Sequence, residues 1–236
     1  MEQFKSQVHQ LDENTYYIDQ FDVHIYLFIG KDKALLTDTG FACFPDLKQI
    51  VTGLTDLPLI VLNSHGHPDH SGAVLSFDRV LAHPDAFESI RQVQGGEGGR
   101  GELVPLADGE EIDIGGRTFQ VILCPGHASG HIALLDRANR VLLPGDMVQR
   151  EHVVMYMPHA DVKQFRESLL LLKSLSGAYD TLLPCHGEVP MEPGQIDNVL
   201  ACIDAYLAGQ LTATDGVGPE GTACKEYILN GFSLML

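Results

Sequence analysis

Three imidazoles and one carboxylate fall within six consecutive positions, in the hexapeptide His65-Gly66-His67-Pro68-Asp69-His70. Imidazole nitrogen and carboxylate oxygen are the ligand atoms that borderline divalent ions such as Zn²⁺ prefer. Gly66 allows the backbone to turn without a side-chain clash, and Pro68 fixes one backbone dihedral angle and stiffens the turn. The hexapeptide therefore predicts a metal-binding loop in preference to a solvated polar turn.

Composition and charge limit the class of protein. The 236 residues are 44% hydrophobic and 20% charged, as in an ordinary soluble globular protein, and we expect residues 1–236 to form a single domain. The formal net charge is −17. Because nucleic-acid phosphates and anionic membrane surfaces attract clustered Lys and Arg, this charge argues against both as partners. A small-molecule substrate remains, and the oligomeric state stays open, a homodimer included.

Targeting signals and disulfide patterns are not visible in the sequence. The first ten residues lack a basic start followed by an apolar run, and no stretch approaches the roughly 18 apolar residues of a spanning helix. The five cysteines are odd in number and widely spaced, at Cys43, Cys124, Cys185, Cys202 and Cys224. We therefore expect a cytoplasmic protein with reduced thiols.

The hydrophobic pattern predicts strands followed by strand–helix alternation in each half of the chain. In the first half, strands are expected at 16–19, 23–29, 34–37, Leu59–Leu62 and 79–82, and helices at 45–54 and 84–93. In the second half, strands are expected at 103–106, 118–123, 131–135, 141–143, 181–183 and 226–229, and helices at 162–175 and 195–207. Residues 94–101 contain five glycines and predict either a substrate lid or a plain connection.

Three later segments repeat one layout, in which an apolar strand and a turn are followed by a residue able to bind metal. They end in Pro125-Gly126-His127, Pro144-Gly145-Asp146 and Pro184-Cys185-His186. The hexapeptide follows the apolar run Leu59–Leu62 in the same way. Because functional sites are commonly built on loops at the strand ends of a rigid sheet, we expect these four segments to meet at one site.

This set of residues resembles the metallo-β-lactamase fold superfamily of metallohydrolases, in its glyoxalase II-like or lactonase-like branch. The resemblance is carried by Thr37-Asp38-Thr39-Gly40, by the segment 125–131 and by seven residues in family order: His65, His67, Asp69, His70, His127, Asp146 and His186. It implies an α/β fold, a four-layer αββα sandwich of two mixed β-sheets flanked by helices. It also implies a binuclear site at one edge of that sandwich.

The resemblance assigns each ligand to one of two divalent metal ions, for which Zn²⁺ is our first choice and Fe or Mn the alternatives. His65, His67 and His127 would hold the first ion, and Asp69, His70 and His186 the second. Asp146 would bridge the two ions, and a hydroxide between them would be the nucleophile. We also hypothesise that Asp69 gives a proton to the leaving group.

Several other residues could have either a functional or a structural role. The position of Asp38 in the family suggests that it orients an imidazole, although a turn cap is an equal alternative. His131 and His24 are interpreted as structural. The loop that follows Asp146 borders the site in this fold, and it supplies three expected substrate contacts: His152, Tyr156 and His159.

Comparison with known branches narrows the substrate by exclusion. Residues 148–157 lack the Lys expected for glutathione thioesters, and Gln149 stands where lactonases of acyl-homoserine lactones have Tyr. Asp146 argues against a true β-lactamase. We therefore predict a hydrolase for a small ester, thioester or lactone. The alternatives are a phosphodiesterase for a small phosphorylated metabolite and a non-catalytic metal-binding or sensing module.

Overall fold

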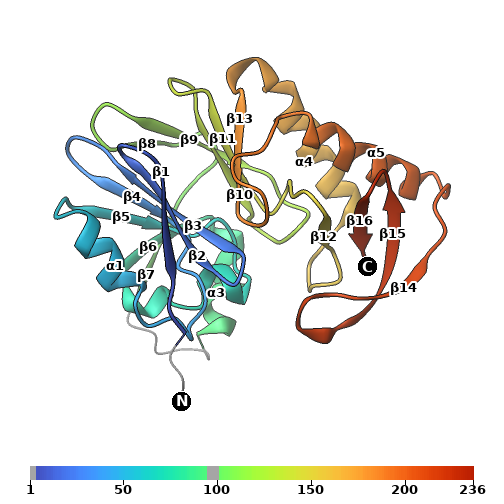
Figure 1. Cartoon of the computed structure of the whole chain (residues 1–236), viewed down its shortest axis with the longest axis horizontal. Coiled ribbons are helices and arrows are strands. Elements are labelled where there is room, and N and C mark those ends of the chain that lie inside the picture. Colours follow the sequence, from blue (N-terminus) through green and yellow to red (C-terminus); the bar gives the residue numbers. More distant parts are fainter. Residues whose placement is uncertain (1–3, 95–100) are drawn as a thin grey trace.

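The chain forms two large β-sheets that pack face to face and carry helices on their outer faces, as the computed structural model of residues 4–94 and 101–236 shows (Figure 1). The first sheet contains seven strands in chain order: β1 (Gln7–Asp12), β2 (Thr15–Gln20), β3 (Val23–Ile29), β4 (Ala34–Thr37), β5 (Leu59–Leu62), β6 (Arg79–Ala82) and β7 (Glu102–Pro105). The second sheet has the order β13-β11-β10-β9-β8: β13 (Thr181–Pro184), β11 (Val141–Gly145), β10 (Ile132–Asp136), β9 (Thr118–Leu123) and β8 (Glu111–Asp113).

Alternation along the strands places apolar side chains on both faces of each sheet. In β3, Ile25 and Leu27 pack on the side of the first helices, whereas Tyr26 and Phe28 pack toward the second sheet. Because both faces of β3 are buried, its sequence is an almost continuous apolar run and does not alternate between apolar and polar residues. The same alternation in β10 completes a core between the two sheets.

The described residues form five α-helices, and four of them match the helices that the hydrophobic pattern predicts. The five are α1 (Leu47–Leu54), α2 (Pro68–Ser71) and α3 (Phe87–Val93) beside the first sheet, and α4 (Val162–Ser174) and α5 (Gln195–Leu207) beside the second. Asp161 caps α4 by accepting hydrogen bonds from the backbone N–H groups of Lys163 and Gln164, and α4 buries Phe165 and Leu169 against the second sheet. The four-layer αββα sandwich predicted from the sequence is therefore confirmed.

A third, four-stranded sheet extends the second half of the chain beyond the expected short strand at 226–229. Its order is β12-β16-β15-β14: β12 (His152–Val154), β16 (Phe232–Met235), β15 (Ala223–Leu229) and β14 (Thr214–Val217). The dipeptide Asn230-Gly231, with positive φ at both residues, forms the tight turn between β15 and β16. An Asn-Gly pair between apolar runs is a strong signal for a β-hairpin, and it explains why a second strand, β16, follows the strand expected at 226–229.

Strand direction brings five chain segments to the same edge of the sandwich. β4 and β5 run parallel, and β11 and β13 run parallel in the other sheet. β9 has the same direction as β11, because both pair antiparallel with β10. A bridge between Val23 and His186 joins the two sheets at this edge. The carboxyl ends of β4, β5, β9, β11 and β13 therefore open onto one site.

Two further expectations from the sequence concern a glycine-rich segment and membrane-spanning helices. The glycine-rich stretch 94–101, expected as a lid or a connection, lies almost entirely outside the described residues. In the described part of the chain, none of the helices has the length and apolarity required to span a bilayer.

A partly buried arginine, Arg117, ties the two sheets together away from the site. Arg117 pairs through Nε with the carboxylate of Asp136, which is fully buried on β10. Its Nη1 donates to Thr15 Oγ1 at 2.8 Å, and its guanidinium carbon lies 4.5 Å from the centre of the Phe28 ring. Thr15 and Phe28 belong to the first sheet, so this side chain bridges both.

Replacing Arg117 with Met should lower the free energy of unfolding by about 3–5 kcal/mol, because it leaves the Asp136 carboxylate buried without a cation. Urea unfolding measures the change. Arg137, whose guanidinium donates to Gln120 at the surface, provides the matched control, and Arg137→Met should cost less than about 0.5 kcal/mol. An equal, small effect for both variants would contradict the bridging role.

Candidate metal centre

The hexapeptide is held rigidly between the end of β5 and helix α2. His67 is the N-cap of α2, and Pro68 occupies the first turn, where its missing N–H costs nothing. The carbonyl of His70 accepts from the backbone N–H of Thr39 at 2.7 Å and from Asn63 Nδ2 at 2.5 Å. Local backbone geometry and neighbouring strands thus fix where the imidazoles point.

Gly66 is required by close packing as well as by the turn. A Cβ at this position would lie 2.5 Å from Ser89 Oγ and 3.1 Å from the backbone nitrogen of Ile90, both on α3. The hexapeptide therefore lies directly against α3, and a larger residue would push the loop away from the site.

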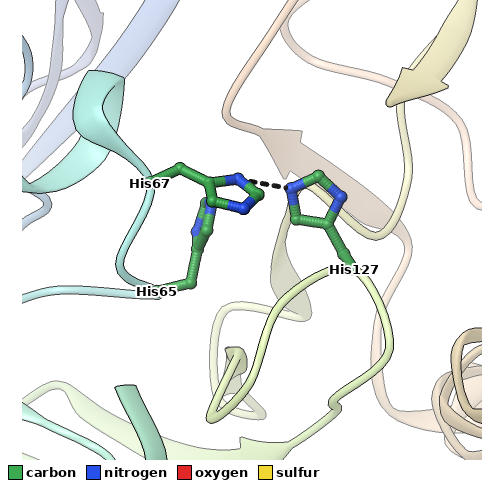
Figure 2. Close-up of side chains that lie close together, drawn as sticks. All are labelled: His65, His67 and His127. Carbon is green, nitrogen blue, oxygen red and sulfur yellow. Dashed lines mark hydrogen bonds between the residues drawn. The ribbon is translucent and has the colours of Figure 1, made fainter. Parts of the chain in front are cut away.

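A first group of imidazoles converges from two loops. His65, His67 and His127 form it, and Figure 2 shows their rings facing one another. His67 Nδ1 and His127 Nε2 are 3.1 Å apart. His65 Nε2 is buried and has no hydrogen-bond partner. An unpartnered buried nitrogen facing two other imidazoles fits a metal ligand.

A second group combines one carboxylate and two imidazoles. Asp69 Oδ2 lies 3.3 Å from His70 Nε2 and 3.5 Å from His186 Nε2, and the two imidazole nitrogens are 3.3 Å apart. His70 and Asp69 come from α2 of the first sheet's layer, whereas His186 follows β13 of the second sheet. This group therefore spans the sandwich.

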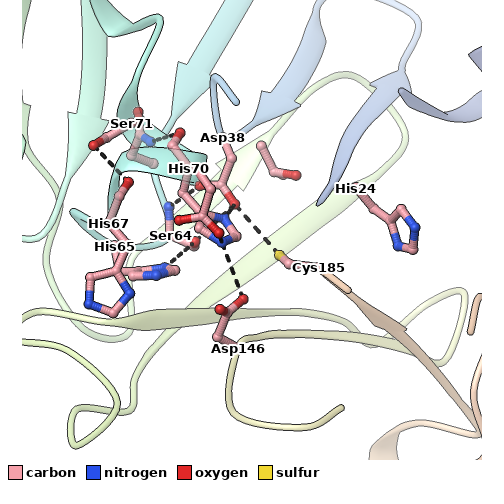
Figure 3. Close-up of polar contacts among 12 residues, drawn as sticks. His24, Asp38, Ser64, His65, His67, His70, Ser71, Asp146 and Cys185 are labelled. Carbon is pink, nitrogen blue, oxygen red and sulfur yellow. Dashed lines mark hydrogen bonds and ion pairs between the residues drawn. The ribbon is translucent and has the colours of Figure 1, made fainter. Parts of the chain in front are cut away.

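Asp146 lies between the two groups. Its Oδ1 is 3.4 Å from His70 Nε2, the contact drawn in Figure 3. Its Oδ2 is 3.4 Å from His127 Nε2 and 3.3 Å from His186 Nε2. One carboxylate thus contacts imidazoles of both groups, which is the position that a bridging ligand requires.

The spacing of these donor atoms fits metal binding. Ligand atoms about 2.0–2.1 Å from a tetrahedral ion lie about 3.3–3.4 Å from one another. The contacts among six of the seven side chains, all except His65, range from 3.1 to 3.5 Å and fall around this value. His67 and His127 are already at hydrogen-bond distance, so a bound ion would replace that contact. The donor set of nitrogen and carboxylate oxygen suits Zn²⁺, Fe²⁺ or Mn²⁺.

The electrostatics of the first group keep its imidazoles neutral. Burial lowers the pKa of His65 and His127 well below the ordinary value, and it also lowers the pKa of His67. Neutral imidazoles offer a free lone pair to a cation, because no proton has to be removed first.

In the second group, neighbouring carboxylates raise the pKa of an imidazole and do not leave it low. Burial acts to lower the pKa of His70, yet the carboxylates of Asp69, Asp146 and Asp38 raise it well above its ordinary value. Burial acts to raise the pKa of Asp146, yet His70 and His186 hold it well below its ordinary range. Several carboxylates therefore surround a point that attracts positive charge, as expected where a divalent cation binds.

Asp38 controls the orientation of one imidazole in each group (Figure 3). Its Oδ2 lies 3.0 Å from His70 Nδ1 and accepts from Ser64 Oγ at 2.9 Å. Since the only hydroxyl proton of Ser64 points to Asp38, the hydroxyl oxygen accepts from His65 Nδ1–H at 3.0 Å. Both imidazoles thus carry their proton on Nδ1 and present Nε2 to the site.

The two histidines expected to be structural are engaged elsewhere. His131 Nε2 accepts from the backbone N–H of Asp146 at 3.1 Å, and its Nδ1 faces Cys124 Sγ at 3.4 Å. His131 therefore positions the loop that carries Asp146. His24 is buried, with its Nδ1 3.4 Å from the carbonyl oxygen of Pro184.

A cavity of about 580 Å³ opens onto both groups. Of the expected substrate contacts, His152 and Tyr156 line this cavity, whereas His159 is exposed and is not among the lining residues. Four other lining residues come from distant segments and are not predicted by the sequence: Phe21, Phe41, Pro219 and Thr222. The sequence contains a signal only for the first, through the short gap between the strands expected at 16–19 and 23–29. Phe21 and Asp22 form a tight turn in this gap, and both have positive φ.

Comparison with known proteins places these features in a family context. The family model described as the metallo-beta-lactamase superfamily matches residues 18–186. The acyl-coenzyme A thioesterase MBLAC2 of Gallus gallus is 27% identical over 198 residues, which cover 69% of this chain and 72% of that protein. Hydroxyacylglutathione hydrolase 1 of Vibrio vulnificus is 30% identical over 130 residues, which cover 54% of this chain and 48% of that protein.

Solved structures share the fold. The metallo-beta-lactamase family protein TTHA1429 from Thermus thermophilus superposes with a TM-score of 0.67 at 24% identity, covering 86% of this chain and 83% of that chain. The DIM-1 metallo-beta-lactamase superposes with a TM-score of 0.70 at 15% identity, covering 87% of this chain and 100% of that chain. At these identities the likeness concerns the fold and not the substrate.

Replacing Asp38 with Asn should weaken Zn²⁺ binding by about 10- to 100-fold, because an amide lacks the charge and one of the acceptor atoms that fix His70 and Ser64. Competition with a chromophoric chelator measures the affinity. Asp85→Asn, which changes a carboxylate with 70% of its side chain exposed, is the matched control.

Ser64→Ala provides a milder test, because it removes only the link between Asp38 and His65. It should weaken Zn²⁺ binding less than Asp38→Asn, and circular dichroism shows whether each variant is folded. Wild-type affinity in a folded Asp38→Asn protein, or in Ser64→Ala alone should Asp38→Asn not fold, would contradict the orienting role.

Proposed function

This chain belongs to the metallo-beta-lactamase superfamily and is a hydrolase, and from this premise we propose that it is a binuclear metal-dependent enzyme that cleaves thioesters. The proposal rests on one observation above all: Asp146 contacts two groups of side chains that could each hold a metal ion, at the end of a cavity of about 580 Å³. The names of the similar acyl-coenzyme A thioesterase and hydroxyacylglutathione hydrolase support thioesters among the acyl substrates.

Each side chain has a defined task in this proposal. His65, His67 and His127 would hold one divalent cation, Asp69, His70 and His186 would hold the other, and Asp146 would contact both. Cations bound there would supply Lewis acidity and lower the pKa of water toward neutrality. The burial of these ligands keeps competing water away from them and strengthens the interactions with developing charge.

Asp69 is the side chain best placed to move a proton. It lines the cavity, and about a quarter of its side chain is exposed. Burial acts to raise its pKa, yet His70 and His186 lower it to about 2. An ionised carboxylate has no proton to give at the start, so Asp69 first accepts the proton of the attacking water and then passes it to the leaving thiolate.

Two further assignments accompany this function. We place the enzyme in the cytoplasm, since its five cysteines are free thiols. We also treat residues 1–236 as one domain, because the core between the sheets combines side chains from both halves of the chain.

Chelation should abolish thioester hydrolysis, and addition of Zn²⁺, Mn²⁺ or Fe²⁺ should restore it. Elemental analysis gives the number of ions bound for each chain. A parallel panel of thioesters, lactones and phosphodiesters separates the possible reactions. Bound metal without turnover of any compound would indicate a binding module, and turnover of phosphodiesters alone would indicate the other hydrolase class.

Asp146→Asn should lower kcat/KM by at least about 100-fold and reduce the metal content, because it removes the carboxylate that contacts both groups. Asp69→Asn should lower kcat with more of the metal retained. Asp180→Asn, at the opposite end of β13, is the matched control: its side chain is 66% exposed and pairs with Arg140. Unchanged turnover in Asp69→Asn would eliminate its proton-transfer role.

A further inference from the structure

The residues at the entrance of the cavity differ in chemistry from those at its floor. The exposed lining residues include an aromatic side chain, three carboxylates and one guanidinium: Phe21, Asp22, Glu151, Glu188 and Arg150. We call this part of the cavity the mouth. Asp22 precedes β3, Arg150 and Glu151 follow the Asp146 loop, and Glu188 follows His186, so the mouth surrounds the metal-binding groups.

Arg150 is the only Arg or Lys side chain among the described lining residues, and it is already paired. Its Nη2 lies 2.6 Å and its Nε 2.8 Å from Glu188 Oε2. Gln195 of α5 donates from Nε2 to the backbone carbonyl oxygens of Gln149 and Arg150, at 2.7 and 3.1 Å, which holds this segment in place. The guanidinium charge is therefore compensated locally, and Asp22 and Glu151 leave the mouth negative.

The apolar part of the mouth is preorganised. Phe21 is 57% exposed, yet its ring lies 4.8 Å from the ring centres of both Phe4 and Phe44 and 5.9 Å from that of Phe41. These contacts hold the ring at the cavity wall without a substrate. A rigid aromatic surface contributes binding energy at low entropic cost, provided that the bound group is apolar.

These observations point to a substrate without negative charge. Phosphate and carboxylate groups are recognised by free Arg or Lys side chains, and the described mouth offers neither. Acidic side chains at the entrance of a cleft also slow the approach of ligands that carry the same sign. The chain as a whole carries −17, so a polyanionic ligand is repelled at long range as well.

Building on the thioesterase function proposed above, we propose that the physiological substrate is a neutral, apolar thioester whose thiol half carries no phosphate. Water adds to the thioester carbonyl carbon, the carbon–sulfur bond breaks, and the thiol leaves with one proton. The other products are a carboxylate and a proton. The carboxylate is the first negative charge that the reacting molecule carries, and the acidic mouth favours its release.

A matched pair of substrates tests the proposal on the metal-loaded enzyme. Octanoyl-N-acetylcysteamine is neutral, and octanoyl-coenzyme A carries the same acyl chain on a polyanionic thiol. The neutral thioester should have a kcat/KM at least about 10-fold higher at low ionic strength. Added salt should raise kcat/KM for the coenzyme A thioester and leave that of the neutral one nearly constant.

Charge variants connect the result to the mouth. Glu188→Gln frees Arg150, so it should shift the ratio of the two kcat/KM values several-fold toward octanoyl-coenzyme A. Glu167→Gln removes the same charge from α4, where the side chain is 71% exposed, and it should leave the ratio unchanged.

Three outcomes are informative against the proposal. Preference for octanoyl-coenzyme A, or a kcat/KM for it that falls with salt, would overturn the neutral substrate and leave the thioesterase function intact. A ratio that changes equally in Glu188→Gln and Glu167→Gln would show that total charge, and not the mouth, sets the preference. Hydrolysis of neither thioester would instead refute the proposed function.

Discussion

The contact of one buried carboxylate with three imidazoles holds this site together. Asp146 reaches His70 from the first half of the chain, and His127 and His186 from the second. Carboxylates and imidazoles gathered in a buried space are costly unless opposite charges compensate one another. Bound divalent cations would provide that compensation. The positions of the loops at this edge of the sandwich therefore depend on how these charges are balanced.

The fold makes this arrangement possible by supporting each ligand from behind. His131 accepts the backbone N–H of Asp146, and Asp38 fixes His70 directly and His65 through Ser64. The backbone N–H of His24 donates to the carbonyl oxygen of Cys185 at 2.8 Å, so the loop of His186 is tied to β3 of the opposite sheet. His24 belongs to strand β3, and Asp38, Ser64 and His131 lie within two residues of the ends of β4, β5 and β10, so the rigid sheets fix these supports.

The sequence predicted the elements, and the side chains that meet at one edge of the sandwich, far better than the residues that line the cavity. The hexapeptide and the three strand–turn segments were recognisable because each has its own local pattern, and parallel strands then carry their ends to a common edge. The family resemblance supplied the grouping of the ligands. The sequence leaves two roles open for Asp38, a turn cap or the orientation of an imidazole. Only the structure shows that its carboxylate faces His70 and Ser64.

The cavity walls could not be predicted because no local pattern records them. Phe21 and Phe41 belong to the first sheet's layer, whereas Pro219 and Thr222 precede β15, and only the packing of the third sheet brings these segments together. The expected contact His159 illustrates the difficulty, because its side chain is exposed and does not line the cavity. Proximity in sequence to Asp146 was not sufficient.

The family match contains every proposed ligand but only part of the cavity entrance. All seven proposed ligands fall within residues 18–186, whereas Glu188, Pro219 and Thr222 lie beyond it. The matched part of the fold therefore contains all seven proposed ligands, and residues beyond it complete the entrance of the cavity. Because the Arg150–Glu188 pair crosses this boundary, a change of one residue outside the match alters the charge that a substrate meets before it reaches the metal-binding groups.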